Sequence, residues 1–225
     1  MRARIGAVSH SVVDSVTLVP ATAMVVHRMP APDGAKLVAL TFDDGPWPGQ
    51  TEAVLDILAR EHVRATFFML GLRVQRAPSL AKRVVDEGHV VGNHSQNHVM
   101  LGTAQARTVI YEMTTGEATI KRYTGVEPVW FRAPGGSVSP LVKAQAKALG
   151  ERMVGWGVDP GDWMRPPSRF IVQRVVGATR PGVTILLHDG GGDRAQTINA
   201  LPEIIRQLRA QGYTFVTLDE LYGPR

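Results

Sequence analysis

The sequence predicts an α/β fold built on a parallel sheet, either a barrel or an open doubly wound sheet. From residue 36 onward, short β-branched or apolar runs alternate with segments of helical periodicity. No linker, low-complexity tract or internal repeat interrupts this alternation. We therefore expect a single domain over residues 36–225, preceded by an N-terminal extension over residues 1–35 that could add one strand within residues 16–26.

Seven strands are expected, each an apolar or β-branched run that ends at turn-forming residues. They span residues 37–42, 66–70, 89–92, 129–132, 153–158, 183–187 and 214–218. The last predicted helix has the clearest pattern, because its Leu and Ile residues recur at i, i+3, i+4 and i+7 and form one apolar stripe. The six expected helices span residues 50–61, 79–87, 104–123, 140–149, 169–178 and 198–210.

The composition restricts the available chemistry. The chain has no cysteine, which excludes disulfides, thiolate zinc sites and cysteine nucleophiles, so histidines and carboxylates remain. Hydrophobic residues make up 44% and charged residues 20%, which argues against a disordered or fibrous protein. The net charge is +5, but the basic residues are scattered, so we expect no nucleic-acid partner. Attraction to an anionic wall polymer or membrane surface would fit the same charge.

The N-terminal segment gives no clear export signal. Arg2 and Arg4 precede a partly apolar stretch with small residues at 21–23, similar to a signal peptide with its cleavage site. His10 and Asp14 interrupt the apolar part. No stretch reaches the roughly 18 apolar residues of a membrane span, so we expect no transmembrane segment.

Polar residues follow the predicted strands, and parallel strands place their carboxyl ends at one edge. Asp43 and Asp44 follow the first strand, and Gly45-Pro46 can supply the bend that brings both carboxylates to one centre. His94 and His98 follow the third strand at i, i+4, a spacing that places two imidazoles on one face of a helical turn, as in paired metal ligands.

Three more strand ends carry chemistry-bearing residues. Arg132 precedes a Pro-Gly-Gly turn, where a guanidinium could orient a carboxylate and the amide of Gly135 could receive an oxyanion. Asp162 and Trp163 join a carboxylate to an aromatic ring that could stack on a sugar. His188 ends the sixth strand. Each could be structural alone, but five of seven strand ends on one face indicate an active site.

The ordered motifs TFDDGP, HSQNH, RAPGG, DPGDW and LLHD resemble those of the polysaccharide deacetylase family, carbohydrate esterase family four, also called the NodB-homology domain. The resemblance extends from about residue 37 to residue 221. It implies a distorted, incomplete (β/α) barrel of seven or eight units. It also implies a hydrolase that removes N-acetyl groups from N-acetylglucosamine residues of peptidoglycan, chitin or chitooligosaccharide.

The resemblance implies a role for each of these residues. Asp44, His94 and His98 would bind one divalent metal ion, with Zn²⁺ expected and Co²⁺, Ni²⁺ or Mn²⁺ as alternatives. In the same family, metal-activated water is the nucleophile.

The resemblance also assigns the proton transfers. Asp43 would be the general base, held by Arg132. His188, oriented by Asp162, would be the general acid that protonates the leaving amine.

Substrate contacts follow from the same resemblance. The amide of Gly135 would face the oxyanion, and Leu186 and Trp163 would line the pocket for the acetyl methyl group. The family usually has an aromatic residue at position 135, so glycine keeps the amide but loses a wall of the substrate groove. Asp159 and Asp189 are candidates for supporting roles only.

Other functions remain open from the sequence. An acetylxylan esterase would use the same centre on an acetyl ester, and an inactive sugar-binding module is a further alternative. A two-histidine, one-carboxylate iron oxygenase shares the ligand set but not the other motifs. We expect an acetylated polysaccharide or oligosaccharide as substrate, a monomer, and the extracellular or cell-envelope location typical of the family.

Overall fold

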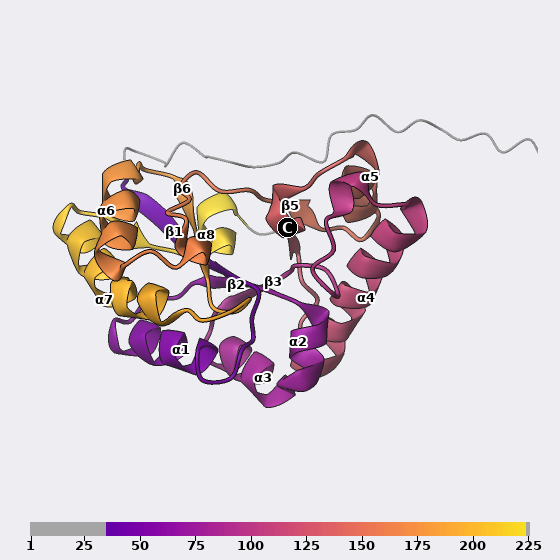
Figure 1. Cartoon of the computed structure of the whole chain (residues 1–225), viewed down its shortest axis with the longest axis horizontal. Helices are drawn as coiled ribbons and strands as arrows, with labels where there is room; N and C mark the ends of the chain where they lie inside the picture. Colours follow the sequence, from indigo (N-terminus) through magenta and orange to yellow (C-terminus); the bar gives the residue numbers. More distant parts are fainter. Residues whose placement is uncertain (1–34, 224–225) are drawn as a thin grey trace, which may run out of the picture.

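The computed structural model describes residues 35–223, and its seven strands form one parallel sheet (Figure 1). The strand order is β5-β4-β3-β2-β1-β6, and β7 pairs with β1 outside this path. The strands are β1 (Leu37–Asp43), β2 (Thr66–Met69), β3 (Val90–Asn93), β4 (Trp130–Phe131), β5 (Arg152–Met153), β6 (Val183–His188) and β7 (Thr214–Phe215).

Strand β1 is central, and three strands pair with it. β6 follows one edge along almost its whole length. On the other edge, β2 pairs with residues 41–43 and β7 with residues 37–38. This register sets Asp43, the last residue of β1, opposite His188, the last residue of β6. A carboxylate and an imidazole therefore emerge side by side from neighbouring strand ends.

The sheet curls into an incomplete barrel, which confirms the predicted fold class. After the short β5, the chain leaves the sheet and returns at Val158, which forms an isolated parallel bridge with Ile185 of β6. The strand predicted at 153–158 is thus divided, because Gly155 and Gly157 weaken the intervening segment. The bridge partly closes the gap between β5 and β6.

Helices surround the curled sheet, with α6 and α7 packed together on one side and α4 and α5 on the other (Figure 1). The six predicted helices are confirmed to within three residues at each end. They are α1 (Thr51–Arg60), α3 (Pro78–Asp86), α4 (Ala106–Thr124), α5 (Pro140–Ala148), α6 (Ser168–Ala178) and α7 (Ala195–Ala210). Short 3₁₀ helices lie at η2 (Leu101–Thr103), η3 (Pro134–Gly136) and η4 (Asp162–Met164).

Two further helices, α2 (Gly71–Arg76) and α8 (Leu218–Tyr222), are absent from the sequence prediction. Residues 214–218 were expected as one strand, but β7 ends at Phe215. The reason is a capping box, in which the Thr217 hydroxyl accepts from the Glu220 amide and the Glu220 carboxylate accepts from the Thr217 amide. These two bonds start α8 where the strand was expected to continue.

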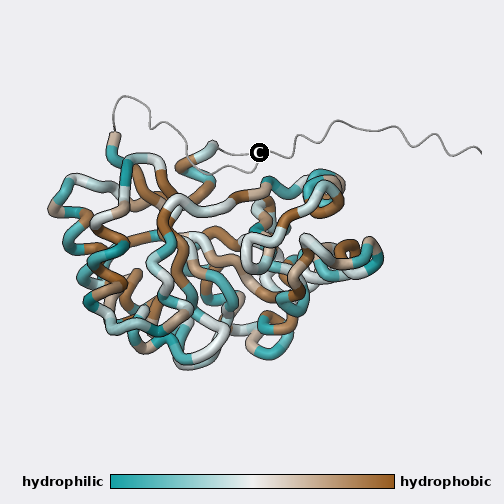
Figure 2. The backbone as a smooth tube through the Cα atoms, turned by 45° about the horizontal axis from the view of Figure 1, so that its top comes forward, coloured by the Kyte–Doolittle hydropathy of each residue, from teal (hydrophilic) through white to brown (hydrophobic). Residues whose placement is uncertain are grey.

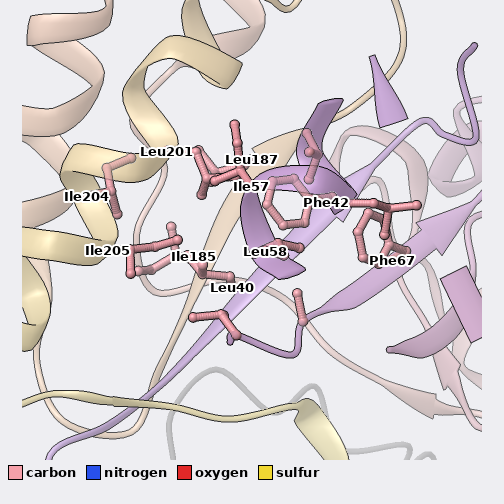
Figure 3. Close-up of a cluster of buried hydrophobic side chains, with 14 of the residues drawn as sticks. Leu40, Phe42, Ile57, Leu58, Phe67, Ile185, Leu187, Leu201, Ile204 and Ile205 are labelled. Atoms are coloured by element: carbon pink, nitrogen blue, oxygen red, sulfur yellow. The ribbon is translucent and has the colours of Figure 1, made fainter. Parts of the chain in front are cut away.

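The alternating faces of β1 separate the core from the site. Val38, Leu40 and Phe42 pack in the main hydrophobic cluster, against side chains of α1 and α7 (Figure 3). Ala39 lies on the other face in a smaller cluster, and Thr41 and Asp43 are buried there too. Figure 2 shows hydrophobic stretches running through the interior, with hydrophilic stretches mainly at the periphery. Asp43 therefore points away from the main apolar core.

The N-terminal extension and its extra strand lie outside the described residues. Within residues 35–223, none of the helices combines the length and the apolar character needed to cross a bilayer.

Candidate active site

A cavity of about 350 Å³ lies at the carboxyl ends of β1, β3 and β6. Eight of the ten site residues predicted from the sequence line it. The other two, Arg132 and Asp162, each hydrogen-bond a residue that does. The eight are Asp43, Asp44, His94, His98, Gly135, Trp163, Leu186 and His188, and Trp156 and Asp159 complete the lining.

Asp44, His94 and His98 place one oxygen and two nitrogens within 4.8 Å of one another. Asp44 Oδ1 lies 3.5 Å from His94 Nε2 and 3.3 Å from His98 Nε2. That oxygen is buried and has no hydrogen-bond partner among residues 35–223. A buried carboxylate oxygen without a partner is costly, and one that faces two imidazoles fits a divalent cation. The residues present therefore suit the metal that the sequence predicts.

His94 is held in the state that a metal ligand needs. Its Nδ1 lies 2.7 Å from the backbone carbonyl oxygen of Arg132. Because a carbonyl can only accept, Nδ1 carries the proton and the lone pair of Nε2 faces Asp44. Burial also lowers the pKa of His94 to about 3, so the imidazole is neutral at neutral pH.

The segment between His94 and His98 is a loop, so the predicted helical turn is wrong. Ser95 has φ 73° and His98 has φ 64°, in the left-handed region that side-chain-bearing residues seldom adopt. The Ser95 hydroxyl accepts from the His98 amide at 3.1 Å. The Glu112 carboxylate of α4 accepts from the amide and side chain of Asn97 at 2.7 and 2.8 Å. These bonds hold the loop so that the imidazole centroids lie 5.2 Å apart.

The turn that separates the two adjacent carboxylates begins at Asp44 itself, one residue before the predicted Gly45-Pro46 bend. Asp43 continues the inner face of β1, whereas Asp44 adopts φ 76°. Strain of this kind, of order 1–3 kcal/mol, persists where the surroundings enforce it, and functional sites are the usual places. The left-handed turn lets both carboxylates reach one cavity.

Arg132 holds Asp43. Its guanidinium donates to Asp43 Oδ1 at 2.8 Å, to the Thr41 hydroxyl at 2.7 Å and to the Gly155 carbonyl at 2.9 Å. Burial raises the pKa of Asp43, and the charge of Arg132 opposes that shift. The second oxygen, Oδ2, lies 3.8 Å from His94 Nε2. One oxygen of Asp43 is therefore anchored, and the other faces the candidate metal-ligand cluster of Asp44, His94 and His98.

His188 and Asp162 form a second buried pair across the cavity. His188 Nδ1 lies 2.7 Å from Asp162 Oδ1, and Asp162 Oδ2 accepts from the His188 amide and the Thr197 hydroxyl, both at 2.9 Å. Burial alone would lower the pKa of His188, but the hydrogen bond and charge of Asp162 outweigh it, so the pKa is raised. With Nδ1 bonded to Asp162, the other ring nitrogen is available to the cavity.

The residues predicted to contact substrate lie around the same cavity. Leu186 is buried, whereas the Trp163 side chain is 52% exposed. A Cβ atom built on Gly135 would lie 2.7 Å from Cε of Met100. Met100 therefore occupies the space that a side chain at position 135 would enter. The sequence analysis missed both Met100 and Trp156, because neither belongs to a recognisable motif.

Arg194 is a further residue that the sequence analysis missed. Its buried guanidinium donates to the backbone carbonyls of Gly190, Gly191 and Trp163 at 2.6, 3.1 and 3.3 Å, and reaches that of Asp162 at 3.5 Å. These carbonyls belong to the loops after β6 and around η4. One arginine therefore joins the two segments that carry His188 and Asp162.

The two supporting candidates differ. Asp189 is buried, accepts from the Thr51 hydroxyl at 2.6 Å and does not line the cavity. Burial raises the pKa of Asp189 to about 7. Asp159 lines the cavity and accepts from the Gly161 amide at 2.8 Å. Asp189 thus lies outside the cavity, between Gly45 and the start of α1, and Asp159 shapes the loop before η4.

Two more cavities flank the central one. A cavity of about 510 Å³ shares Trp156 with it and contains Lys143. A cavity of about 270 Å³ shares Asp44 and His98 with it. The central cavity therefore adjoins a second cavity at Trp156 and a third at Asp44 and His98, which suits a ligand longer than one sugar.

Comparison with known proteins agrees with this geometry. The sequence profile of the polysaccharide deacetylase family matches residues 31–154. A peptidoglycan-N-acetylglucosamine deacetylase of Bacillus cereus is 43% identical over 192 residues, which cover 84% of this chain and 90% of that protein. A chitooligosaccharide deacetylase of a Bradyrhizobium species is 39% identical over 201 residues, covering 84% of this chain and 92% of that protein.

A solved structure supports the same assignment. The crystal structure of the Bc1960 peptidoglycan N-acetylglucosamine deacetylase superimposes with a TM-score of 0.81 at 36% identity. The match covers 84% of this chain and 89% of that chain. The similarity therefore extends over the sheet and the cavity at its carboxyl edge.

Proposed function

The chain belongs to the polysaccharide deacetylase family, and from this premise we propose that it is a metal-dependent hydrolase of N-acetyl groups on N-acetylglucosamine residues. The substrate would be a polysaccharide or oligosaccharide of the peptidoglycan or chitin type. The observation that carries the proposal is the unpartnered Asp44 Oδ1 facing two imidazoles, in one cavity with the anchored Asp43 and His188. We propose residues 36–225 as the catalytic domain and the cell envelope as its location, as the wall-acting relative suggests.

Asp44, His94 and His98 would hold the metal, for which Zn²⁺ is expected from two histidines and one carboxylate. When bound, the ion supplies Lewis-acid polarisation of the acetyl carbonyl and a more acidic water. The neutral state of His94 and its anchored Nδ1 suit it to bind without first losing a proton.

Asp43 is the proposed general base. Its Oδ1 is bonded to Arg132, so the free Oδ2 would take the proton of the attacking water. The water oxygen bonds to the acetyl carbon, and the amide of Gly135 would donate to the oxyanion that develops. The raised pKa of Asp43 makes it a stronger base than an exposed aspartate.

His188 is the proposed general acid. With Nδ1 bonded to Asp162, its other nitrogen would give a proton to the sugar nitrogen as the carbon–nitrogen bond breaks. Acetate and a free amine are the products. An amine is a poor leaving group unless it is protonated, so the raised pKa of His188 serves this step. Leu186 and Trp163 would surround the acetyl methyl group.

The test combines metal analysis with acetate release. We expect one divalent ion per chain and acetate release from N-acetylglucosamine oligosaccharides and wall glycan. Asp44→Ala should remove metal and activity together, with His62→Ala, which alters an exposed histidine outside the cavity, as the matched control. Release from acetylated xylan alone would instead indicate an esterase. Stoichiometric metal in Asp44→Ala would exclude Asp44 as a ligand.

A further inference from the structure

The cavity of about 270 Å³ beside Asp44 and His98 is lined by Arg73. The Arg73 guanidinium lies 3.8 Å from the centroid of the Trp47 ring. Within residues 35–223 it makes no side-chain hydrogen bond and no salt bridge; its one polar neighbour of opposite charge is Asp44, whose Oδ1 faces the two histidines. A half-buried cation without a carboxylate of its own is suited to receive one from a ligand.

Stacking on Trp47 prepares Arg73 for that role. The guanidinium carbon lies over the Trp47 ring, which restricts the Arg73 side chain, and a stacked guanidinium can still donate through its N–H groups. Two parallel N–H donors match the two oxygens of a carboxylate. The backbone of Trp47 is held as well, because its amide donates to the Thr51 hydroxyl at 2.7 Å. Little side-chain freedom would be lost when a carboxylate binds.

The position of this cavity relates it to the reaction. It shares Asp44 and His98 with the central cavity, so a group bound there would be attached close to the reacting N-acetyl group. Asn97 also lines it and is held in place by Glu112. A polymer that presents its N-acetyl group to Asp43 and His188 would extend over Arg73.

We propose that Arg73, stacked on Trp47, binds a carboxylate carried by the polysaccharide near the reacting sugar. The inference rests on the proposed deacetylase function and narrows its substrate to glycans with acidic substituents. Neutral chitin and xylan offer no such group. Free acetate has the same chemistry, so the experiment must separate a carboxylate on the polymer from the released product.

The experiment uses the metal-loaded full chain and two hexasaccharides of alternating N-acetylglucosamine and N-acetylmuramic acid. In one the lactyl carboxylates are free, and in the other they are methyl-esterified. We expect the parent to show a lower KM for the free acid. We define the preference as the KM for the methyl ester divided by the KM for the free acid. Arg73→Gln should reduce this ratio about tenfold, as for loss of a charged hydrogen bond, and Arg73→Lys should reduce it less.

Arg76→Gln is the matched control, because it removes the same charge from α2 at an exposed position outside the cavity. The preference should stay within twofold in this variant. Equal KM values for the two glycans in the parent would overturn the proposal, as would an equal loss of preference in both variants. A change confined to inhibition by added acetate would assign Arg73 to the product instead. A parent that releases acetate from neither glycan, nor from a chitin hexasaccharide, would refute the deacetylase function itself.

Discussion

The Nδ1 atom of His94 donates to the backbone carbonyl of Arg132 over 2.7 Å, while the side chain of the same arginine holds Asp43 at 2.8 Å. One residue thus orients a proposed metal ligand through its main chain and the proposed base through its side chain. Because every residue has a backbone carbonyl, the two roles are separable by substitution.

Arg132→Lys tests this separation. The variant keeps the backbone carbonyl and the positive charge. It loses the guanidinium, whose separate N–H groups bond Thr41, Asp43 and Gly155 at the same time. We expect metal content to remain at the parent level while kcat falls roughly 10- to 100-fold. Asp43→Asn should behave in the same way, with kcat reduced by roughly 10²-fold or more. Loss of metal from Arg132→Lys, measured by elemental analysis, would show that His94 depends on the side chain instead.

Activity on amides should persist to higher pH than the ordinary histidine pKa of 6.5 allows, because the proposed general acid His188 has to be protonated and its pKa is raised. In Asp162→Asn the carboxylate charge that opposes burial is gone, so the pKa of His188 should be lower than in the parent. The alkaline limb of the kcat profile should therefore move to lower pH. An activated acetate ester serves as the control, because its leaving group needs no acid. An unmoved limb on the N-acetyl substrate would contradict the role of Asp162.

A separate pH effect concerns stability. His89 is buried, accepts from the Ala65 amide at 3.1 Å and has its pKa lowered by burial from 6.5 to about 4. The unfolded chain therefore binds more protons between these two pH values, and stability is lost as pH falls from 6.5 through 4. The loss amounts to about 3 kcal/mol.

His89→Asn keeps an acceptor at the position of Nδ1 but cannot be protonated. Urea unfolding of parent and variant should show that the free energy of unfolding falls less in the variant when the pH is lowered from 7 to 4.5. The difference between the two proteins isolates His89 from other groups, including His94, if the sites are independent. If the free energy of unfolding falls by the same amount in parent and variant, His89 does not contribute to the pH dependence of stability.

Met100 and Gly135 should be energetically coupled. Gly135→Ala forces a side chain into φ 58° and against Met100, which we expect to destabilise the fold by about 1–2 kcal/mol. In the Met100→Ala background the contact is absent, so the same substitution should cost less by about 0.5 kcal/mol or more. Urea unfolding of the four proteins gives the coupling. If the free-energy changes of the two single variants add up to that of the double variant, Met100 moves aside without cost and the two residues are not coupled.

Much of the site could be predicted because it lies at strand ends. Asp43 and His188 end paired strands, and the parallel topology alone brings such residues to one edge. The strand limits were less accurate where the deciding contacts are local side-chain bonds, as at Thr217 and Glu220. A T-x-x-E pattern was available there as a capping signal.

Other features depend on partners distant in sequence. The loop between His94 and His98 takes its shape partly from Glu112 in α4, which no local pattern shows. Arg73 meets Trp47 through cation–π stacking that links α2 to the turn after β1. Spacing between histidines predicted their proximity, but the backbone that produces it is not helical.

Arg194 ties four backbone carbonyls from two loops to one buried charge. Separating these loops would take the Asp162 and Trp163 carbonyls away from the buried guanidinium and leave it only those of Gly190 and Gly191 in its own loop, which is unfavourable for a buried charge. The loops that carry His188 and Asp162 should therefore stay rigid when a substrate binds. Adjustment to a bulky polymer is then expected away from these loops, near Gly135, where the adjoining Met100 is half-exposed.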